Sequence, residues 1–319
     1  MMLRDWRQAD ASVVRQCYER EQRSWQDDLG WDTTWTWATV EQARISWGLP
    51  GLLACDDDGT VHGWAFSMPD GARLHIGGLV AASPSLTEAL LDHMIAHPAA
   101  GGGLACFIRD RAPGLVNALT CRGFEVERFL YLARPLTAED ARLVAGFASP
   151  SRGWTDRDFA AAVALLQASY SSEAGRHFAA SGAAAEWAKY LSGVVQQAGC
   201  GIIDRAATRV HLECGGLQAL ALVTAIHPQT AHLAQLAVHP DLRGCGVGAR
   251  LVREALACAA STGKTAMTLL VGEHNQRARR LYDSLGFEER ATFVAARMTK
   301  RPAVQVLEPR DRQLVAGTI

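Results

Sequence analysis

The sequence predicts an α/β (α+β) chain that consists of two tandem domains of the same fold. Short apolar runs typical of strands alternate with amphipathic segments at helical spacing along the chain. The second half repeats the order of elements of the first, and a Gly-Phe pair follows a helical segment in both, at 123–124 and at 286–287. A length of 319 residues suits two domains of ordinary size. A repeat of such long period indicates two copies of one domain.

Composition and charge exclude several classes of partner. Hydrophobic residues make up 49% of the chain, which is ample for packed cores. The net charge of −1 and the pI of about 6.8 show no basic excess, so we expect no nucleic acid and no anionic membrane as a partner. No segment approaches the ~20 apolar residues of a spanning helix, and the charged N-terminus does not fit a signal peptide.

The 8 cysteines are scattered along the chain, and none forms a Cys-x-x-Cys pair. A disulfide scaffold or a zinc site usually needs closely spaced cysteines. We therefore expect reduced thiols, a cytoplasmic location and no metal.

The first domain is expected over residues 1–135. A short strand and a helix fill 1–24, where Asp10 is placed to cap the helix. An Asp-Gly turn between two apolar runs predicts a hairpin over 52–66. Further strands are expected at 73–80, 104–108 and 129–133, and helices at 86–96 and 113–121.

Two features of this domain allow a second interpretation. Five tryptophans follow the first helix at irregular spacing, Trp25, Trp31, Trp35, Trp37 and Trp47. Packing in a core or lid is the expectation that we favour, and an aromatic wall for a substrate is the alternative. The acidic run 56–58 lacks the spaced oxygen ligands of a calcium loop, so a solvated turn is expected there.

The second domain is expected over 153–300, after a linker at 136–152 that includes a short helical pattern, and before a tail at 301–319. Helices are predicted at 158–169, 183–195, 247–261 and 275–284. Strands are predicted at 200–203, 209–213, 217–225, 233–239, 266–271 and 293–298.

The most specific stretch is the loop Arg243-Gly-Cys-Gly-Val-Gly248, between a strand and a helix. Glycine lets the backbone turn sharply and approach a ligand without a Cβ in the way. The first N–H groups of a helix lack intrahelical partners, and the helix dipole favours negative charge there. The loop therefore predicts a cradle for phosphate or diphosphate. It is neither a Walker A motif, since no Gly-Lys-Ser/Thr follows, nor a Rossmann fingerprint, since the glycine spacing differs.

This loop resembles the Arg/Gln-x-x-Gly-x-Gly/Ala loop of the GNAT acyltransferases, which use acetyl-coenzyme A. Asn275, Ala278, Leu281-Tyr282 and 285–287 resemble the second block of that family, at the expected distance. The resemblance covers residues 204–300. It implies two tandem GNAT-like domains, each with a mixed central sheet flanked by helices.

In the first domain, aligning the two Gly-Phe pairs puts Leu119 at the place of Tyr282 and Ala112 at that of Asn275, and the glycine loop has no counterpart. The first domain thus looks like a degenerate copy.

The resemblance also implies an N-acetyltransferase that moves an acetyl group from acetyl-CoA to an amine by direct attack. Its pantetheine arm would pair with the strand at 236–238, and its diphosphate would sit on the loop. The implied cofactor-binding residues are Leu236, Ala237, Val238, Arg243, Gly244, Cys245, Gly246, Val247, Gly248, Asn275 and Ala278.

Tyr282 is the implied general acid, because a tyrosine with a pKa near 10 can donate a proton to a departing thiolate. Asn275 would also cap its helix. Cys245 is not expected to act as a nucleophile, since direct transfer needs no acyl-enzyme.

The general base is left open by the sequence. Glu213 ends a strand and is our first choice; His211 shares its face by alternation. His232 and His239 flank the cofactor strand, and a chain of waters would serve as well.

The acceptor is expected to be a small-molecule or peptide amine, and a homodimer stays open. One alternative function is a non-catalytic acetyl-CoA sensor, against which an intact Tyr282 argues. The other is an acyltransferase for longer acyl groups, because fold alone does not fix the substrate.

Overall fold

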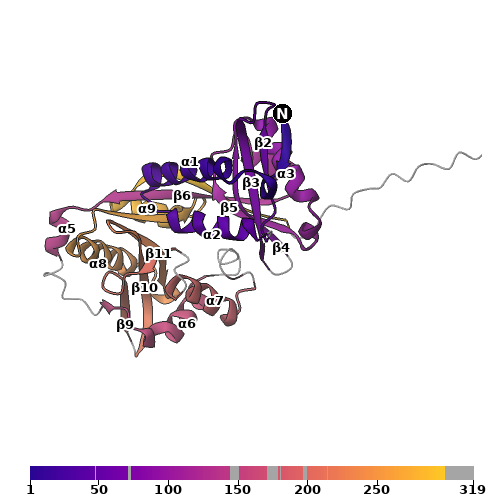
Figure 1. Cartoon of the computed structure of the whole chain (residues 1–319). Helices are drawn as coiled ribbons and strands as arrows, with labels where there is room; N and C mark the ends of the chain where they lie inside the picture. The colour runs from indigo at the N-terminus through magenta and orange to yellow at the C-terminus, as the bar shows by residue number, and fades with distance from the viewer. Residues whose placement is uncertain are drawn as a thin grey trace, which may run out of the picture.

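The computed structural model describes residues 1–46, 48–70, 73–143, 151–170, 179, 181–196, 200–213 and 215–298. The predicted tail, Trp47, Cys214 and much of the predicted linker lie outside these residues. The described chain is a mixed α/β fold, as the sequence predicts (Figure 1).

The two halves contain their elements in parallel order. The N-terminal half has β1 (Met2–Asp5), α1 (Ala11–Leu29), α2 (Thr34–Ile45), β2 (Gly51–Cys55), β3 (Val61–Asp70), β4 (Arg73–Ala81), α3 (Pro84–Ala96), β5 (Leu104–Arg109), α4 (Leu115–Cys121) and β6 (Glu125–Pro135). The C-terminal half has α5 (Ala138–Arg142), β7 (Ser151–Gly153), α6 (Phe159–Ser169), α7 (Ala184–Val195), β8 (Ile202–Ile203), β9 (Arg209–Glu213), β10 (Gly216–His227), β11 (Thr230–Val238), α8 (Val247–Ser261), β12 (Ala266–Gly272), α9 (Gln276–Ser284) and β13 (Glu288–Met298).

Local sequence signals explain several of these elements. Asp10 caps α1, and its carboxylate accepts the N–H of Ser12 at 2.7 Å. The acidic run forms the turn between β2 and β3, where Asp56 and Asp58 both accept the N–H of Thr60.

Two elements were not predicted from the sequence. The first is α2, whose pattern of tryptophans and β-branched residues hides a helical period. The second is β7, which begins inside the predicted linker.

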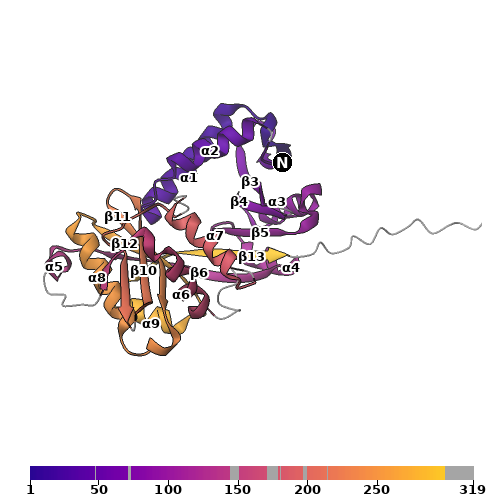
Figure 2. The ribbon, with the colours of Figure 1, turned by 90° about the horizontal axis from the view of Figure 1, so that it is seen from below.

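The strands join into one sheet, in the order β1-β2-β3-β4-β5-β13-β6-β12-β11-β10-β9-β7, with β8 beside β10. The last strand of each half pairs with a strand of the other half. β13 lies between β5 and β6, and β6 lies between β13 and β12, all in antiparallel pairs (Figure 2). Each half thus completes its part of the sheet with the last strand of the other half. The proposed division at residue 135 separates strands that pair with each other.

Helices cover both faces of this sheet. Helices α3, α4, α8 and α9 pack on one face, here called the α8 face, while α1, α2, α6 and α7 pack on the other, the α1 face. Side chains of β13 alternate between the faces: Val294 joins the core under α3 and α4, and Phe293 packs under α1.

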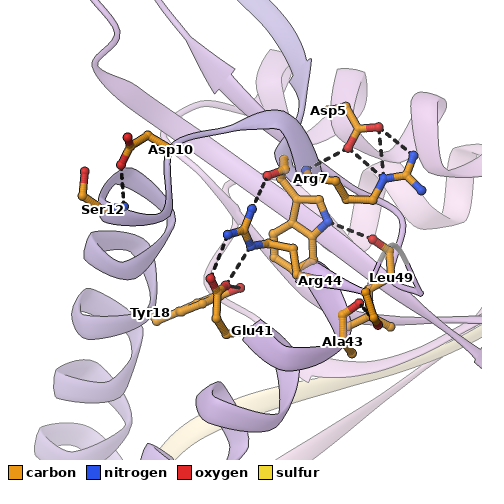
Figure 3. A network of polar contacts seen from close by, with 11 residues as sticks. Asp5, Arg7, Asp10, Ser12, Tyr18, Glu41, Ala43, Arg44 and Leu49 are labelled. Carbon is orange, nitrogen blue, oxygen red and sulfur yellow. Dashed lines mark hydrogen bonds and ion pairs between the residues drawn. The ribbon is translucent and has the colours of Figure 1, made fainter.

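A polar network ties the start of the chain to α1 and α2 (Figure 3). Buried Arg44 donates to the carboxylate of Glu41 at 2.7 Å and to the carbonyl of Trp6 at 2.8 Å. Tyr18 also donates to Glu41, at 3.2 Å, and the indole of Trp6 donates to Leu49 O at 3.0 Å. Because the buried charge of Arg44 is paired and hydrogen-bonded, it can be accommodated in this core.

In each half, the sheet opens between two parallel strands that occupy corresponding positions. β11 pairs in parallel with β12 only over Thr230–Leu233, and β4 pairs in parallel with β5 only over Leu74–Ile76. Past these points the parallel strands diverge. Each opening is next to a register shift, between β10 and β11 in one half and between β3 and β4 in the other.

Candidate active site

The opening in the C-terminal half holds a cleft of about 470 Å³. It is bounded by the free edge of β11, the loop that leads into α8, the start of α9, and the end of α6. Ten of the residues implied as cofactor-binding line it together: Leu236, Ala237, Val238, Arg243, Gly244, Gly246, Val247, Gly248, Asn275 and Ala278.

The glycine loop has the backbone that its sequence demands. Gly244 has φ of +88° and Gly246 has φ of +78°, a left-handed conformation that other residues rarely adopt. Gly246 is the N-cap of α8, and no side chain caps this helix. A Cβ built at either glycine would meet nothing within 4 Å, so the loop borders open space. Uncapped N–H groups facing open space suit an anion.

Gly248 serves a different purpose, since its φ is not left-handed. A Cβ there would lie 3.4 Å from Val238 Cγ2 and 3.9 Å from Leu236 Cδ2. The first turn of α8 therefore approaches β11 closely.

Two further residues of the loop differ in their surroundings. Cys245 is exposed and is not among the residues that line the cleft. The guanidinium of Arg243 donates to the carbonyls of Val238, at 3.4 Å, and of Ser169. Arg243 thus links the loop to β11 and to the end of α6.

The start of α9 forms the opposite wall. Asn275 caps the helix, as predicted, and its Oδ1 accepts the N–H of Ala278 at 3.1 Å. Arg277 also lines the cleft and adds a positive charge that sequence analysis did not single out. A cation in the first turn carries no recognisable motif, so no signal in the sequence could have found it.

Tyr282 is buried on the same helix. Its side chain is 6% exposed, its ring packs edge-on against Phe287, and it does not line the cleft. Burial, with a smaller contribution from neighbouring Tyr170, raises its pKa well above the usual range. The phenol therefore keeps its proton at any ordinary pH.

A chain of polar side chains from α6 and α7 reaches the free edge of β11. Tyr190 donates to Gln235 Oε1 at 2.7 Å, and the amide nitrogen of Gln235 donates to the hydroxyl of Tyr170. Tyr170 in turn donates to Leu236 O at 3.1 Å, and Ser169 Oγ donates to Val238 O at 3.2 Å. Burial raises the pKa of Tyr170 to about 12. Neither Ser169 nor Tyr170 was found from the sequence, because the end of a helix carries no mark of a remote contact.

The residues considered as a base are dispersed. Glu213 does not line the cleft; its half-exposed carboxylate lies 3.3 Å from His211 Nε2, on β9, with β10 between it and β11. His211 also contacts Arg250 at 3.2 Å. His239 lies 3.5 Å from Asp241 at the surface.

His232 differs because it is buried. Its Nδ1 is 2.9 Å from Thr268 Oγ1, and its ring stands edge-on to Trp31 from the N-terminal half. Desolvation lowers its pKa to about 4, so it is neutral at pH 7.

In the parts of the chain that the structure describes, no three His, Cys, Asp or Glu side chains are grouped as metal ligands. Nor is any described helix both long and apolar enough to cross a bilayer.

Comparisons with known proteins find similarity in the part of the chain that contains the cleft. Residues 169–287, which include β11, the glycine loop and α9, match the model of the acetyltransferase (GNAT) family. An uncharacterized N-acetyltransferase of Methanocaldococcus jannaschii is 36% identical over 74 residues, which cover 23% of this chain. The match spans about a third of that relative, 33% of its length.

Solved structures share the fold over most of the chain. A GCN5-related N-acetyltransferase from Sphaerobacter thermophilus aligns with a TM-score of 0.53 and 17% identity, over 79% of this chain and 81% of its own. A GNAT-family acetyltransferase from Colwellia psychrerythraea aligns with a TM-score of 0.53 and 12% identity, over 93% of this chain and 100% of its own. Over residues 169–287, this chain is similar to the GNAT family of acetyltransferases.

Proposed function

We propose that the protein is an N-acetyltransferase that binds acetyl-CoA in the cleft beside β11 and acetylates an amine of a small molecule or peptide. The observation that carries the proposal is the meeting of three elements in one cleft: a diverging strand edge, an uncapped glycine-rich helix start, and the capped start of α9. Acetyl-CoA supplies an acetyl group activated as a thioester.

The residues of the cleft fit such a ligand. The N–H groups of the loop and of the first turn of α8 would hold the diphosphate, with Arg277 nearby. Leu236, Ala237 and Val238 would hold the pantetheine arm along the strand edge. An N–H near Val238 would stabilise negative charge on the thioester oxygen.

Proton transfer needs an acid and a base. Tyr282 would protonate the departing thiolate, because burial keeps its phenol protonated. None of the candidate bases lines the cleft. Glu213 would reach the amine only through intervening water, since it stands outside the cleft lining. His232 lies on β11, but it is buried and does not line the cleft either.

Calorimetric titration of acetyl-CoA into the full chain tests the proposal, with Gly248→Asp and Gly248→Ala as a matched pair. The φ at Gly248 permits any side chain, and the alanine Cβ fits against Val238. Asp adds a carboxylate where the diphosphate is proposed. We expect one binding site in the native chain and in Gly248→Ala, and at least tenfold weaker binding in Gly248→Asp.

Two results would contradict the proposal. If acetyl-CoA does not bind to the native chain, the cleft is not a site for this cofactor. Binding without turnover of any amine in a broad panel leaves the cofactor site but favours a non-catalytic sensor.

A further inference from the structure

The N-terminal half has a second cavity, of about 200 Å³, in its own strand opening. Its floor is formed by Gly77–Ala81 of β4 and Phe107–Arg109 of β5. It shares no lining residue with the cleft beside β11, and β13 and β6 lie between the two openings. This cavity is therefore a separate site.

On the α8 face this opening differs from its counterpart. α3 begins at Pro84 and is capped by Ser83, without a glycine loop. Pro84 Cβ lies 3.4 Å from where a Cβ on Gly114 would be, so the starts of α3 and α4 are in contact. Leu119, at the place of Tyr282, is fully buried in the core. The diphosphate cradle has no equivalent here.

The lining comes instead from the α1 face and is rich in aromatic rings. Trp25 of α1, Trp37 of α2 and Trp64 of β3 meet Phe107 of β5 around the cavity. Trp37 and Trp64 stand edge-on with centroids 5.7 Å apart, and the ring of Phe107 is 40% exposed. Flat apolar walls of this kind favour a planar ring as ligand. The small volume limits such a ligand to about one ring with a short polar end.

Opposite charges line the same cavity. Glu21 is half-buried, and its Oε2 accepts the indole N–H of Trp25 at 3.2 Å. Arg111 is half-exposed and lies 3.9 Å from Asp28, whose carboxylate is already held by Arg109 at 2.6 Å. A guanidinium has five donors, so Arg111 keeps donors for a ligand carboxylate. Glu21 offers an acceptor for an ammonium group.

We propose that this cavity is a binding site for a small aromatic zwitterion, an aromatic α-amino acid. Its ring lies among the tryptophans, its ammonium group on Glu21 and its carboxylate on Arg111. The site is distinct from the proposed acetyl-transfer cleft, and its ligand is bound rather than converted.

Calorimetric titrations of the full chain with three probes test this proposal: L-phenylalanine, 3-phenylpropionate, which lacks the ammonium group, and phenethylamine, which lacks the carboxylate. We expect phenylalanine to bind at one site and each truncated probe to bind at least about tenfold more weakly, because a hydrogen bond to a charged group is lost. Glu21→Gln should remove the preference for phenylalanine over 3-phenylpropionate. Arg111→Gln should remove the preference for phenylalanine over phenethylamine.

Two control substitutions lie on α1, the helix that carries Glu21. Glu19→Gln and Arg15→Gln change exposed residues of α1 that do not line this cavity, and both should keep the full preference. Gly248→Asp should leave phenylalanine binding unchanged. The proposal is overturned if phenylalanine does not bind at millimolar concentrations, if Glu21→Gln and Arg111→Gln leave the preferences intact, or if Gly248→Asp abolishes binding.

Discussion

The hydroxyl of Tyr170 donates a hydrogen bond of 3.1 Å to the backbone carbonyl of Leu236. This carbonyl belongs to the free edge of β11, the edge proposed to pair with the pantetheine arm. A side chain of the protein thus occupies an acceptor that the ligand would otherwise use. The contact makes Tyr170 a competitor for the strand edge as well as a wall of the cleft.

We expect Tyr170→Phe to bind acetyl-CoA more tightly than the native chain, because the carbonyl of Leu236 is released. The variant should also lose about 1 kcal/mol of unfolding free energy with its hydrogen bonds. Titration calorimetry and urea unfolding measure the two effects. Tyr190→Phe is the matched control, since it breaks the bond to the side chain of Gln235 and leaves the carbonyl of Leu236 bonded to Tyr170. If Tyr170→Phe and Tyr190→Phe lose affinity for acetyl-CoA equally, Tyr170 does not compete with the ligand for the carbonyl of Leu236.

Tyr282→Phe should lower kcat by about 100-fold, because it removes the proposed general acid. The Kd for acetyl-CoA should not change, because Tyr282 does not line the cleft. Since burial raises the pKa of Tyr282, the native rate should show no decline from its ionisation below about pH 10. Steady-state kinetics from pH 6 to pH 9.5 test both statements. A variant with native kcat would remove Tyr282 from the mechanism.

His232 makes stability depend on pH. Its pKa is lowered to about 4 by burial, while an unfolded histidine titrates near 6.5. As the pH falls below about 6.5, the unfolded chain binds a proton that the folded chain does not, so stability is complete above this pH and declines toward pH 4. We expect a loss of about 2 kcal/mol between pH 7 and pH 5.

Urea unfolding at the two pH values measures this loss. His232→Gln should reduce the difference between pH 7 and pH 5, and His274→Gln, at an exposed position, should not. The same slope in His232→Gln and in the native chain would show that another group causes the dependence.

The exchanged strands predict how fragments behave. A fragment of residues 1–143 lacks β13 and leaves β5 and β6 apart, while a fragment of residues 144–319 lacks β6. Unpaired strand edges favour aggregation. We expect neither fragment to fold alone and the two to form a soluble complex when they are expressed together. Size-exclusion chromatography and circular dichroism decide this; a folded, monomeric 144–319 fragment would contradict it.

Local chemistry explains what the sequence reveals about the site. The glycines at 244 and 246 are required by left-handed backbone, and Asn275 by the unpaired N–H groups of a helix start. Such demands act within a few residues, so they appear as a motif. The loop, the start of α9 and most strands were therefore predictable.

Contacts between remote segments leave no such mark. Tyr170 meets Leu236 across 66 positions, and the partners of β13 are fixed by the whole sheet rather than by its own residues. The position of Glu213 outside the cleft lining also depends on strand order, which alternation of side chains does not give. Pairing between distant strands is the part of the fold that pattern analysis leaves undetermined.

The position of β13 has a consequence for synthesis. A ribosome makes the N-terminal half first, yet β5 obtains its second neighbour, β13, only when residues 288–298 have emerged. Until then the nascent chain carries an incomplete sheet, which is a surface that chaperones recognise. A stop codon or frameshift late in the gene would therefore damage the beginning of the protein as much as its end.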